Sequence, residues 1–461
     1  MTEADQKFIR MTQAPVERLV CEMAIPTIAI MLISSLYNMA DTYFVGALGT
    51  SATAAVGVVF SLMAIIQAVG FFFGHGSGNY ISRELGAQNI DKAEKMAATG
   101  LISSLSIGAF IGIAGLLFLE LLVFLLGATP TIAPYACDYM FYILIGTPFM
   151  VASLMLNNLL RFQGSAFYGM IGMLTGAILN IGLDPLFIFV FKMGVGGAAL
   201  ATIISQAASF FLLLYGCTKK GNVRIRIKNF APGLKIYREI IRGGFPSLCR
   251  QSIASIATII MNTIAGSFGD AAIAAISIVG RVILFASSAL IGLGQGFQPV
   301  CGFNYGAKRY DRVKKAFWFC VKIATVTLTA ISIAGIIFAP NVIALFRKDD
   351  VEVIQIGVLT LRLQCYTLPL MGWAIASNMM LQTIGKTARA SILAFARQGL
   401  FLIPFLFMLP PLMGILGLQL SQPISDIATF ILSIPLTVGV LKEMTNESPS
   451  ITAEGEVRLG H

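Results

Sequence analysis

Charged residues are scarce in this sequence, and their scarcity excludes most soluble folds. Asp, Glu, Lys and Arg make up 12% of the 461 residues, which is about half the share found in a typical soluble domain. Hydrophobic residues make up 57%, and runs such as 101–126 and 323–340 reach the roughly 18 residues that mark a membrane-spanning helix. The composition therefore predicts an all-α integral membrane protein.

Motifs for enzyme chemistry are missing as well. The seven cysteines stand singly, without the paired spacing of a metal or redox site, and no Walker, HExxH or GxSxG motif occurs. The glycine-rich runs 70–78 and 292–296 lie within apolar segments and lack a following Gly-Lys-Ser/Thr, so they predict close helix packing rather than phosphate-binding loops. We therefore expect no enzyme activity and no cofactor, and the energy must come from a gradient or from a partner.

Breaks at charges and at Gly/Pro clusters divide the hydrophobic runs into twelve predicted spans. The spans are 18–41, 52–80, 97–126, 134–159, 166–190, 194–217, 238–265, 272–300, 316–345, 354–381, 388–409 and 412–440. The predicted domains are an amino-terminal segment 1–17, an N-lobe of six helices at 18–217, a basic linker 218–237, a C-lobe of six helices at 238–440, and a polar, disordered tail 441–461.

Basic residues are distributed unevenly between the loops. If the amino terminus is cytoplasmic, the inside segments hold 24 Lys or Arg and the outside loops hold three. The positive-inside rule then places both termini in the cytoplasm. This topology explains the net charge of +10 without a nucleic-acid partner. We interpret the basic segment 219–242 as a topology signal, with binding of anionic lipid as the alternative.

An internal repeat emerges when the chain is slid against itself by 220 residues. Pro26 then meets Pro246, and Gly49 meets Gly269. With one inserted residue, Asn157 and Gly164 meet Asn378 and Gly385. Because the repeat unit is six spans, both copies enter the membrane from the same side, as parallel repeats of transporters do.

Two acidic residues close predicted spans in the first half. Asp41 follows Asn38 by three residues, and Asp184 follows Asn180 by four. Both spacings place an amide and a carboxylate on one helix face. A charge near the bilayer centre costs at least about 2.5 kcal/mol, so each carboxylate needs an explanation. Local bonding at the water interface is one alternative.

A cation-binding cluster is the other alternative. If the faces carrying Asp41 and Asp184 converge, Asn157 and Thr202 on neighbouring spans would add an amide and a hydroxyl. Oxygen ligands suit a hard cation such as Na⁺, and burial beside a second carboxylate favours the protonated acid. The cluster therefore predicts a site for H⁺ or Na⁺.

Other polar residues within the spans are interpreted as structural. Asp426 lies in the last span, and we expect it to pair with Arg281 or Arg397 across the second half. His75 lies in a glycine-rich helix, where it is expected to pack and to form hydrogen bonds, with a proton relay as the alternative.

Several local patterns together resemble the multidrug and toxic compound extrusion (MATE) family. They are Asn38-Met39-Ala40-Asp41 closing the first span, Arg161-Phe162-Gln163-Gly164 after the fourth, and Asn180 with Asp184-Pro185 in the fifth. The resemblance covers about residues 18–440. It implies two pseudo-symmetric six-helix lobes in a V around a central cavity, and export of cationic or amphipathic compounds in exchange for H⁺ or Na⁺.

The resemblance also implies roles for individual residues. The cation-coupling residues would be Asp41, Asp184, Asn180, Thr202 and Asn157, and a bound Na⁺ would use Asp41, Asn180, Asp184 and Thr202. The residues expected to line the substrate cavity are Tyr37, Asn38, Met31 and Met155, and Pro26 is the expected bending point. Some members carry acidic residues on the seventh and tenth spans. Here the seventh has none and the tenth has Asn378, which favours the DinF-like or MepA-like bacterial branch.

Two rival functions remain open at this point. A lipid-linked precursor flippase of the same superfamily would need cationic residues facing the cavity, and Arg250, Arg281 and Arg397 are candidates. A membrane-embedded enzyme would need a paired catalytic motif, which the sequence does not show. We expect a monomer in the bacterial inner membrane, with small organic cations, amphipathic drugs and membrane lipids as its partners.

Overall fold

The computed structural model describes residues 3–346 and 350–447, and these residues form helices joined by short loops. The first half contains α1 (Glu3–Gln13), α2 (Val16–Gly46), α3 (Thr50–Gly86), α4 (Ile90–Leu117), α5 (Leu119–Leu125), α6 (Ala133–Phe162), α7 (Ala166–Pro185), η1 (Leu186–Val190) and α8 (Gly194–Thr218). The second half contains η2 (Ile227–Asn229), α9 (Leu234–Gly266), α10 (Asp270–Gly306), α11 (Tyr310–Phe346), α12 (Val351–Thr367), η3 (Leu368–Leu370), α13 (Met371–Thr383), α14 (Thr387–Phe395), η4 (Ala396–Leu402), α15 (Ile403–Met413) and α16 (Ile415–Glu447).

These helices are long enough to cross a membrane. Eleven of the described helical stretches combine sufficient length with high hydropathy. The remaining span is α2, whose 31 residues correspond to about 46 Å at 1.5 Å per residue. Each predicted span lies on one helix or on consecutive helical segments, the third on α4 and α5, the fifth on α7 and η1, and the eleventh on α14, η4 and α15. The tenth is divided into α12 and α13 by a 3₁₀ turn at Pro369, because proline cannot donate the backbone hydrogen bond of a continuous helix.

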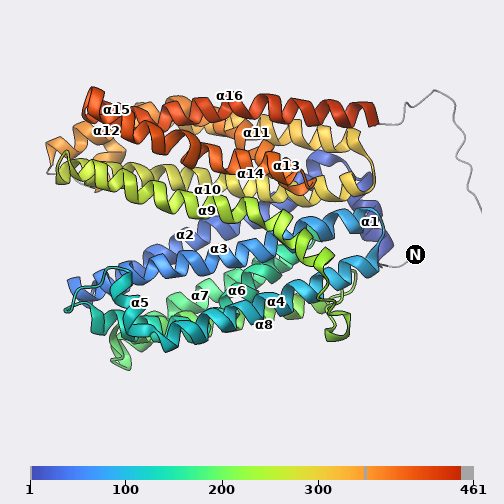
Figure 1. Cartoon of the computed structure of the whole chain (residues 1–461), viewed down its shortest axis with the longest axis horizontal. Helices are drawn as coiled ribbons and strands as arrows, with labels where there is room; N and C mark the ends of the chain where they lie inside the picture. Colours follow the sequence, from blue (N-terminus) through green and yellow to red (C-terminus); the bar gives the residue numbers. More distant parts are fainter. Residues whose placement is uncertain (1–2, 347–349, 448–461) are drawn as a thin grey trace, which may run out of the picture.

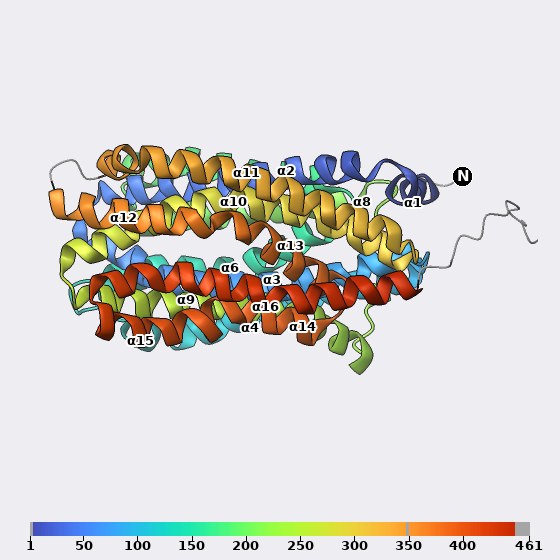
Figure 2. The same cartoon turned by 90° about the horizontal axis from the view of Figure 1, so that it is seen from above.

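The helices form two lobes arranged as a V, which confirms the predicted fold class. Figure 1 shows the first-half helices in one bundle and the helices from α9 onward in the other. The end where α1 begins and α16 ends is called the terminal end below. The ribbons of the two lobes diverge away from it, and Figure 2 shows the same helices from above.

The first helix of each lobe begins in the core of the other lobe. Leu19 and Met23 of α2 are buried among second-lobe residues such as Phe317. Ile240 of α9 is buried in the first-lobe core. This exchange joins the lobes at the terminal end and leaves the far halves of α2 and α9 to line the space between them.

Glycines allow the two lobes to meet closely in this terminal half. A Cβ atom at Gly86 of α3 would lie 2.1 Å from the Phe303 carbonyl oxygen of α10, and one at Gly306 would lie 2.0 Å from the Arg83 carbonyl oxygen. Gly76 and Gly296 meet α9 and α2 in the same way, at 2.4 Å. Only glycine permits backbones to approach this closely. The predicted packing role of the two glycine-rich runs is confirmed.

The structure also confirms the internal repeat at specific backbone positions. Gly49 and Gly269 precede α3 and α10 with φ values of 113° and 106°. Gly164 and Gly385, which are aligned by the one-residue insertion, have φ values of 81° and 83°. Side chains rarely adopt these left-handed conformations, so glycine is retained in both copies.

The amino-terminal helix α1 was not predicted, and it spans both lobes. The Lys7 ammonium donates to Ser165 Oγ and Asn222 Oδ1 of the first half, both at 2.7 Å. Arg309 donates to the Thr12 carbonyl at 3.2 Å, so a second-half cation satisfies a carbonyl at the end of α1, where the helix dipole is negative. The predicted disordered tail 441–461 is wrong in its first part, because α16 continues as a helix to Glu447; the rest of the tail lies outside the described residues.

Candidate ion and substrate sites

Three helices bring the predicted acidic cluster together. Asp41 comes from α2, Asn180 and Asp184 from α7, and Thr202 from α8. Asp184 is fully buried one residue before the end of α7, while Asn180 and Thr202 are each 1% exposed. Since Asn180 and Asp184 are four residues apart, they lie on one face of the helix, as their spacing predicted.

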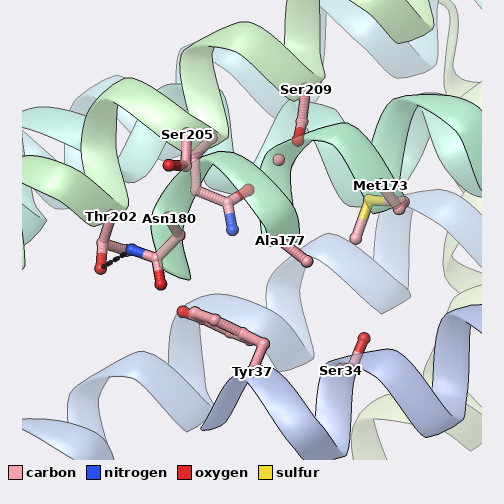
Figure 3. A pocket seen from close by; sticks show the side chains of 10 residues that line it. Ser34, Tyr37, Met173, Ala177, Asn180, Thr202, Ser205 and Ser209 are labelled. Atoms are coloured by element: carbon pink, nitrogen blue, oxygen red, sulfur yellow. Dashed lines mark hydrogen bonds between the residues drawn. The ribbon is translucent and has the colours of Figure 1, made fainter. Parts of the chain in front are cut away.

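Hydrogen bonds link the amide to its neighbours. Asn180 Nδ2 lies 3.3 Å from both Asp184 Oδ1 and Thr202 Oγ1 and donates to these oxygens. Thr202 Oγ1 in turn donates to the Ala198 carbonyl at 3.1 Å. Figure 3 shows the Asn180–Thr202 contact, with Tyr37 facing it from α2. The amide and the hydroxyl are therefore oriented by the protein itself.

Three acceptor oxygens of the cluster are buried without a partner in the described part of the chain. They are Asp41 Oδ1, Asn180 Oδ1 and Asp184 Oδ2. Neither carboxylate forms an ion pair with a described lysine or arginine. Buried polar atoms normally have partners. Two uncompensated carboxylates and an orphan amide oxygen fit a proton or a hard cation such as Na⁺.

Two tyrosines complete the cluster: Tyr37 was predicted to line the substrate cavity, and Tyr139 was not predicted at all. The hydroxyls of Tyr37 and Tyr139 both interact with Thr202 and lie in the field of both carboxylates. Tyr139 is on α6 and is 1% exposed. Which face of α6 points toward the cluster depends on the rotation of that helix, and a prediction of span boundaries does not provide it.

Asn157 takes no part in the cluster, contrary to expectation. Its Oδ1 lies 2.7 Å from where a Cβ of Gly169 would be, near the start of α7. Gly169 precedes Asp184 by 15 residues, which is about 22 Å along a helix. Because α6 and α7 run in opposite directions, the residue level with Asp184 lies about four turns before Asn157, close to Tyr139.

A pocket of about 360 Å³ lies beside the cluster. It is lined by Ser34, Tyr37, Met173, Gly176, Ala177, Asn180, Thr202, Ser205, Gln206 and Ser209. Among the predicted cavity residues, Tyr37 lines this pocket. Met31 is partly buried one turn before Ser34 on α2, and the side chain of Asn38 lies outside the described residues.

Met155 is a packing residue, which corrects its predicted place in the substrate cavity. It is fully buried in the core of the first lobe. Its methyl group lies 2.7 Å from where a Cβ of Gly100 would be, so it fills the space between α6 and α4.

The second lobe contains a different polar site. Arg397 Nε lies 2.8 Å from Asp426 Oδ1, and the Gln422 amide donates to the same oxygen at 2.8 Å. The predicted internal ion pair is therefore confirmed, with Arg397 as the partner, while Arg281 is exposed on α10. A pocket of about 350 Å³ is lined by Arg250, Met371, Ala374, Ile375, Asn378, Met379, Leu393, Arg397 and Thr429.

His75 takes part in a buried network between the lobes, as expected of a structural histidine. Its Nε2 lies 3.3 Å from Arg161 Nη2, and its Nδ1 lies 3.1 Å from the Phe71 carbonyl oxygen. Arg161 Nη1 crosses to α10, where it donates to the Gln295 carbonyl and to Gln298 Oε1 at 2.7 and 2.8 Å. A neutral imidazole that donates from Nδ1 and accepts at Nε2 satisfies both contacts.

Comparison with known proteins adds an independent line of information. The family model MatE matches residues 26–186 and 246–408, one match in each half. The chain is similar to the multidrug export protein MepA of Staphylococcus haemolyticus, with 28% identity over 452 residues, 97% of this chain and 99% of that protein.

Solved structures are similar along nearly the whole chain. A crystal structure of MATE in the bent conformation superposes with a TM-score of 0.90 at 27% identity, covering 96% of this chain and 99% of that one. The outward-facing conformation of a multidrug resistance MATE family transporter of the MOP superfamily gives 0.89 at 27% identity, covering 95% and 98%.

Proposed function

The chain belongs to the MatE family, and from this premise we propose that it is a secondary multidrug exporter that exchanges cationic or amphipathic molecules for H⁺ or Na⁺. The observation that carries the proposal is the pair of carboxylates, Asp41 and Asp184, whose buried oxygens lack basic partners in the described chain. Uncompensated acids in a membrane bundle mark ion and substrate pathways. The name of the similar MepA protein supports the assignment to drug export.

The orientation of the V follows from charge. The excess of Lys and Arg at the terminal end assigns that end to the cytoplasm under the positive-inside rule. The space between the lobes then faces outward, in a multi-pass protein of the bacterial inner membrane with both termini inside. Two fused lobes supply both walls of this space, so we expect a monomer that contacts lipid and drug and no nucleic acid.

The proposed cycle couples ion uptake to a bend in α2. H⁺ or Na⁺ enters the Asp41–Asp184 cluster and changes its hydrogen bonds. The helix bends at Pro26, which lies inside α2 and cannot donate a helical hydrogen bond. Tyr37 and Ser34 lie on the same helix and line the pocket, so the bend expels the substrate. The ion-loaded lobes then rock to the inward-facing state, where the ion leaves.

This cycle is driven only by the different affinities of the substrate and the ion for the outward-facing and inward-facing states. Substrate and ion each favour the state to which they bind more tightly, and each shifts the equilibrium by that difference alone. Release of the ion restores the negative charge of the cluster, which attracts the next cationic substrate. The two ligands therefore compete through one site and its charge.

A lipid-linked precursor flippase is the second candidate, and one observation favours it. Arg250 and Arg397 both line the second-lobe pocket, and cationic residues suit a phosphate headgroup. The first-lobe carboxylates have no role in that function. We therefore rank it below drug export.

The deciding experiment measures uptake of a fluorescent organic cation by proteoliposomes under an imposed proton gradient and then a sodium gradient. Gradient-driven uptake that Asp41→Asn abolishes is the expected result, and the effective gradient identifies the ion. Asp270→Asn, the same change at an exposed position of α10, is the matched control and retains uptake. Undiminished transport by Asp41→Asn would overturn the coupling site.

A further inference from the structure

Arg250 is the feature of the second lobe that the proposed cycle does not use. It lies midway along α9, is partly buried, and lines the pocket of about 350 Å³. Its one hydrogen bond in the described structure runs from Nη1 to Asn378 Oδ1 at 3.3 Å. A guanidinium has five N–H donors in a fixed fork, so most of its donors are available to a ligand.

No carboxylate of the described residues neutralises this arginine. Asp426 pairs instead with Arg397, another residue of the pocket wall, at 2.8 Å and also accepts from Gln422. It accepts a further bond from Thr367 at 3.4 Å. Arg397 is thus compensated and Arg250 is not, which leaves one net positive charge facing the pocket.

Arg161 shows what a purely structural arginine looks like in the same bundle. It is 2% exposed, and its Nη atoms donate to the Gln295 carbonyl, Gln298 Oε1 and Asn158 Oδ1. Arg250 is only partly buried and has one hydrogen-bond partner in the described structure. Arg161 lies near enough to add to the positive potential around it.

We propose that this second-lobe pocket is an anion subsite in which Arg250 binds a carboxylate or phosphate group of an amphipathic substrate. The apolar body of the substrate lies against Met371, Ile375, Met379 and Leu393, which line the same pocket. Arginine suits this role because its fork binds both oxygens of a carboxylate or phosphate at once.

This inference rests on the proposed export function, but its test begins with binding and needs no gradient. Rhodamine 110 carries a carboxylate, and rhodamine 123 is its methyl ester with no anionic group. The Kd of each dye is measured by fluorescence polarisation with the purified full chain in phosphatidylcholine nanodiscs. Because the two dyes share one ring system, the difference between their Kd values reports the contribution of the carboxylate.

Arg250→Gln should raise the Kd of rhodamine 110 about tenfold or more and leave that of rhodamine 123 unchanged or lower. Arg250→Lys should give a Kd for rhodamine 110 between those of the wild type and Arg250→Gln, since lysine keeps the charge but lacks the two-pronged guanidinium. Arg281→Gln, at an exposed position of the neighbouring helix α10, is the matched control and should change neither Kd. Melting temperatures of all variants check that they are folded.

Equal weakening of both dyes by Arg250→Gln, or no change in either, would overturn the anion subsite. Adding phosphatidylglycerol to the nanodiscs separates the two sources of the anion. If phosphatidylglycerol displaces rhodamine 110 from the wild type but not from Arg250→Gln, the site is assigned to a lipid phosphate. If phosphatidylglycerol displaces no rhodamine 110, the site is assigned to a soluble carboxylate. If neither the proton gradient nor the sodium gradient drives transport while Arg250-dependent binding is intact, the export function is rejected and the anion subsite stands.

Discussion

The two lobes share a backbone plan and differ in charge. Among the described residues, two carboxylates of the first lobe lack basic partners, and Arg250 of the second lobe lacks an acidic one. Asn378 Nδ2 donates to the Ala390 carbonyl, and the aligned Asn157 faces Gly169, which is the position aligned with Ala390. The repeat thus preserved a helix contact while the chemistry beside it diverged.

The offset between the repeats shows where the divergence lies. An offset of 221 residues aligns Gly176 with Arg397 and Ser205 with Asp426. Gly176 and Ser205 line the first-lobe pocket, and their counterparts form the second-lobe ion pair. In the first lobe the small residues at these positions leave space for a pocket, and in the second lobe a charged pair occupies them. Gene duplication therefore supplied a symmetric frame for two unlike sites.

Removing the first-lobe charge should have the largest effect. Asp184→Asn replaces a fully buried carboxylate with a neutral group of the same shape, so ion uptake loses its charge change. We expect gradient-driven export to fall to the background rate in proteoliposomes. Export that still responds to an ion gradient would show that the lobes do not differ in this way.

Breaking the second-lobe ion pair should reduce stability more than transport. Arg397→Gln leaves Asp426 buried without its cation, and removal of one member of a buried pair costs about 3 kcal/mol or more. The double variant Arg397→Gln/Asp426→Asn should recover most of the loss. Thermal unfolding in detergent measures the stability loss in the single variant and the recovery in the double variant. A double variant as unstable as the single one would argue against a mainly structural pair.

Disturbing the shared glycine contact should affect both lobes alike. Gly86→Ala places a Cβ where only 2.1 Å separates it from the Phe303 carbonyl, and Gly306→Ala does the same against Arg83 at 2.0 Å. Overpacking of this kind costs about 1–3 kcal/mol. We expect the terminal end to loosen and the opposite ends of the lobes to move closer.

Distances between spin labels at Leu125 and Leu345, two exposed positions on different lobes, measure this movement, with the exposed Cys21 replaced by Ser. Gly57→Ala is the control, because nothing lies within 4 Å of its added Cβ. A change in only one of the two glycine variants would break the symmetry inferred for the contact.

The smallest effect is expected at the helix that joins the lobes. Burial lowers the pKa of Lys7 from 10.5 to about 7, so above pH 7 the folded protein binds fewer protons than the unfolded chain. Stability should therefore rise with pH between about 7 and 10. Lys7→Met should remove this rise and lower the melting temperature slightly. An unchanged pH dependence of the melting temperature would contradict the assignment.

Several local features could be predicted because neighbouring residues decide them. The spans follow from runs of apolar residues, and the Asn180–Asp184 pair follows from a four-residue spacing on one helix. The sequence predicted that the partner of Asp426 is Arg281 or Arg397 but could not choose between them. The choice depends on how the helices are rotated about their axes relative to each other. The same rotation decides that Met155 faces the core and that Tyr139 faces the carboxylates.

The sequence alone determined the twelve spans, the six-span repeat, the glycine packing faces and the acidic pair of the first half, since each is a property of spacing along one helix or of composition. Only the tertiary structure decided that α2 and α9 begin in opposite lobes, that α1 joins both lobes, and that no acid of the described chain pairs with Arg250. These depend on helix rotation and register between segments far apart in the chain, which hydrophobic periodicity does not specify.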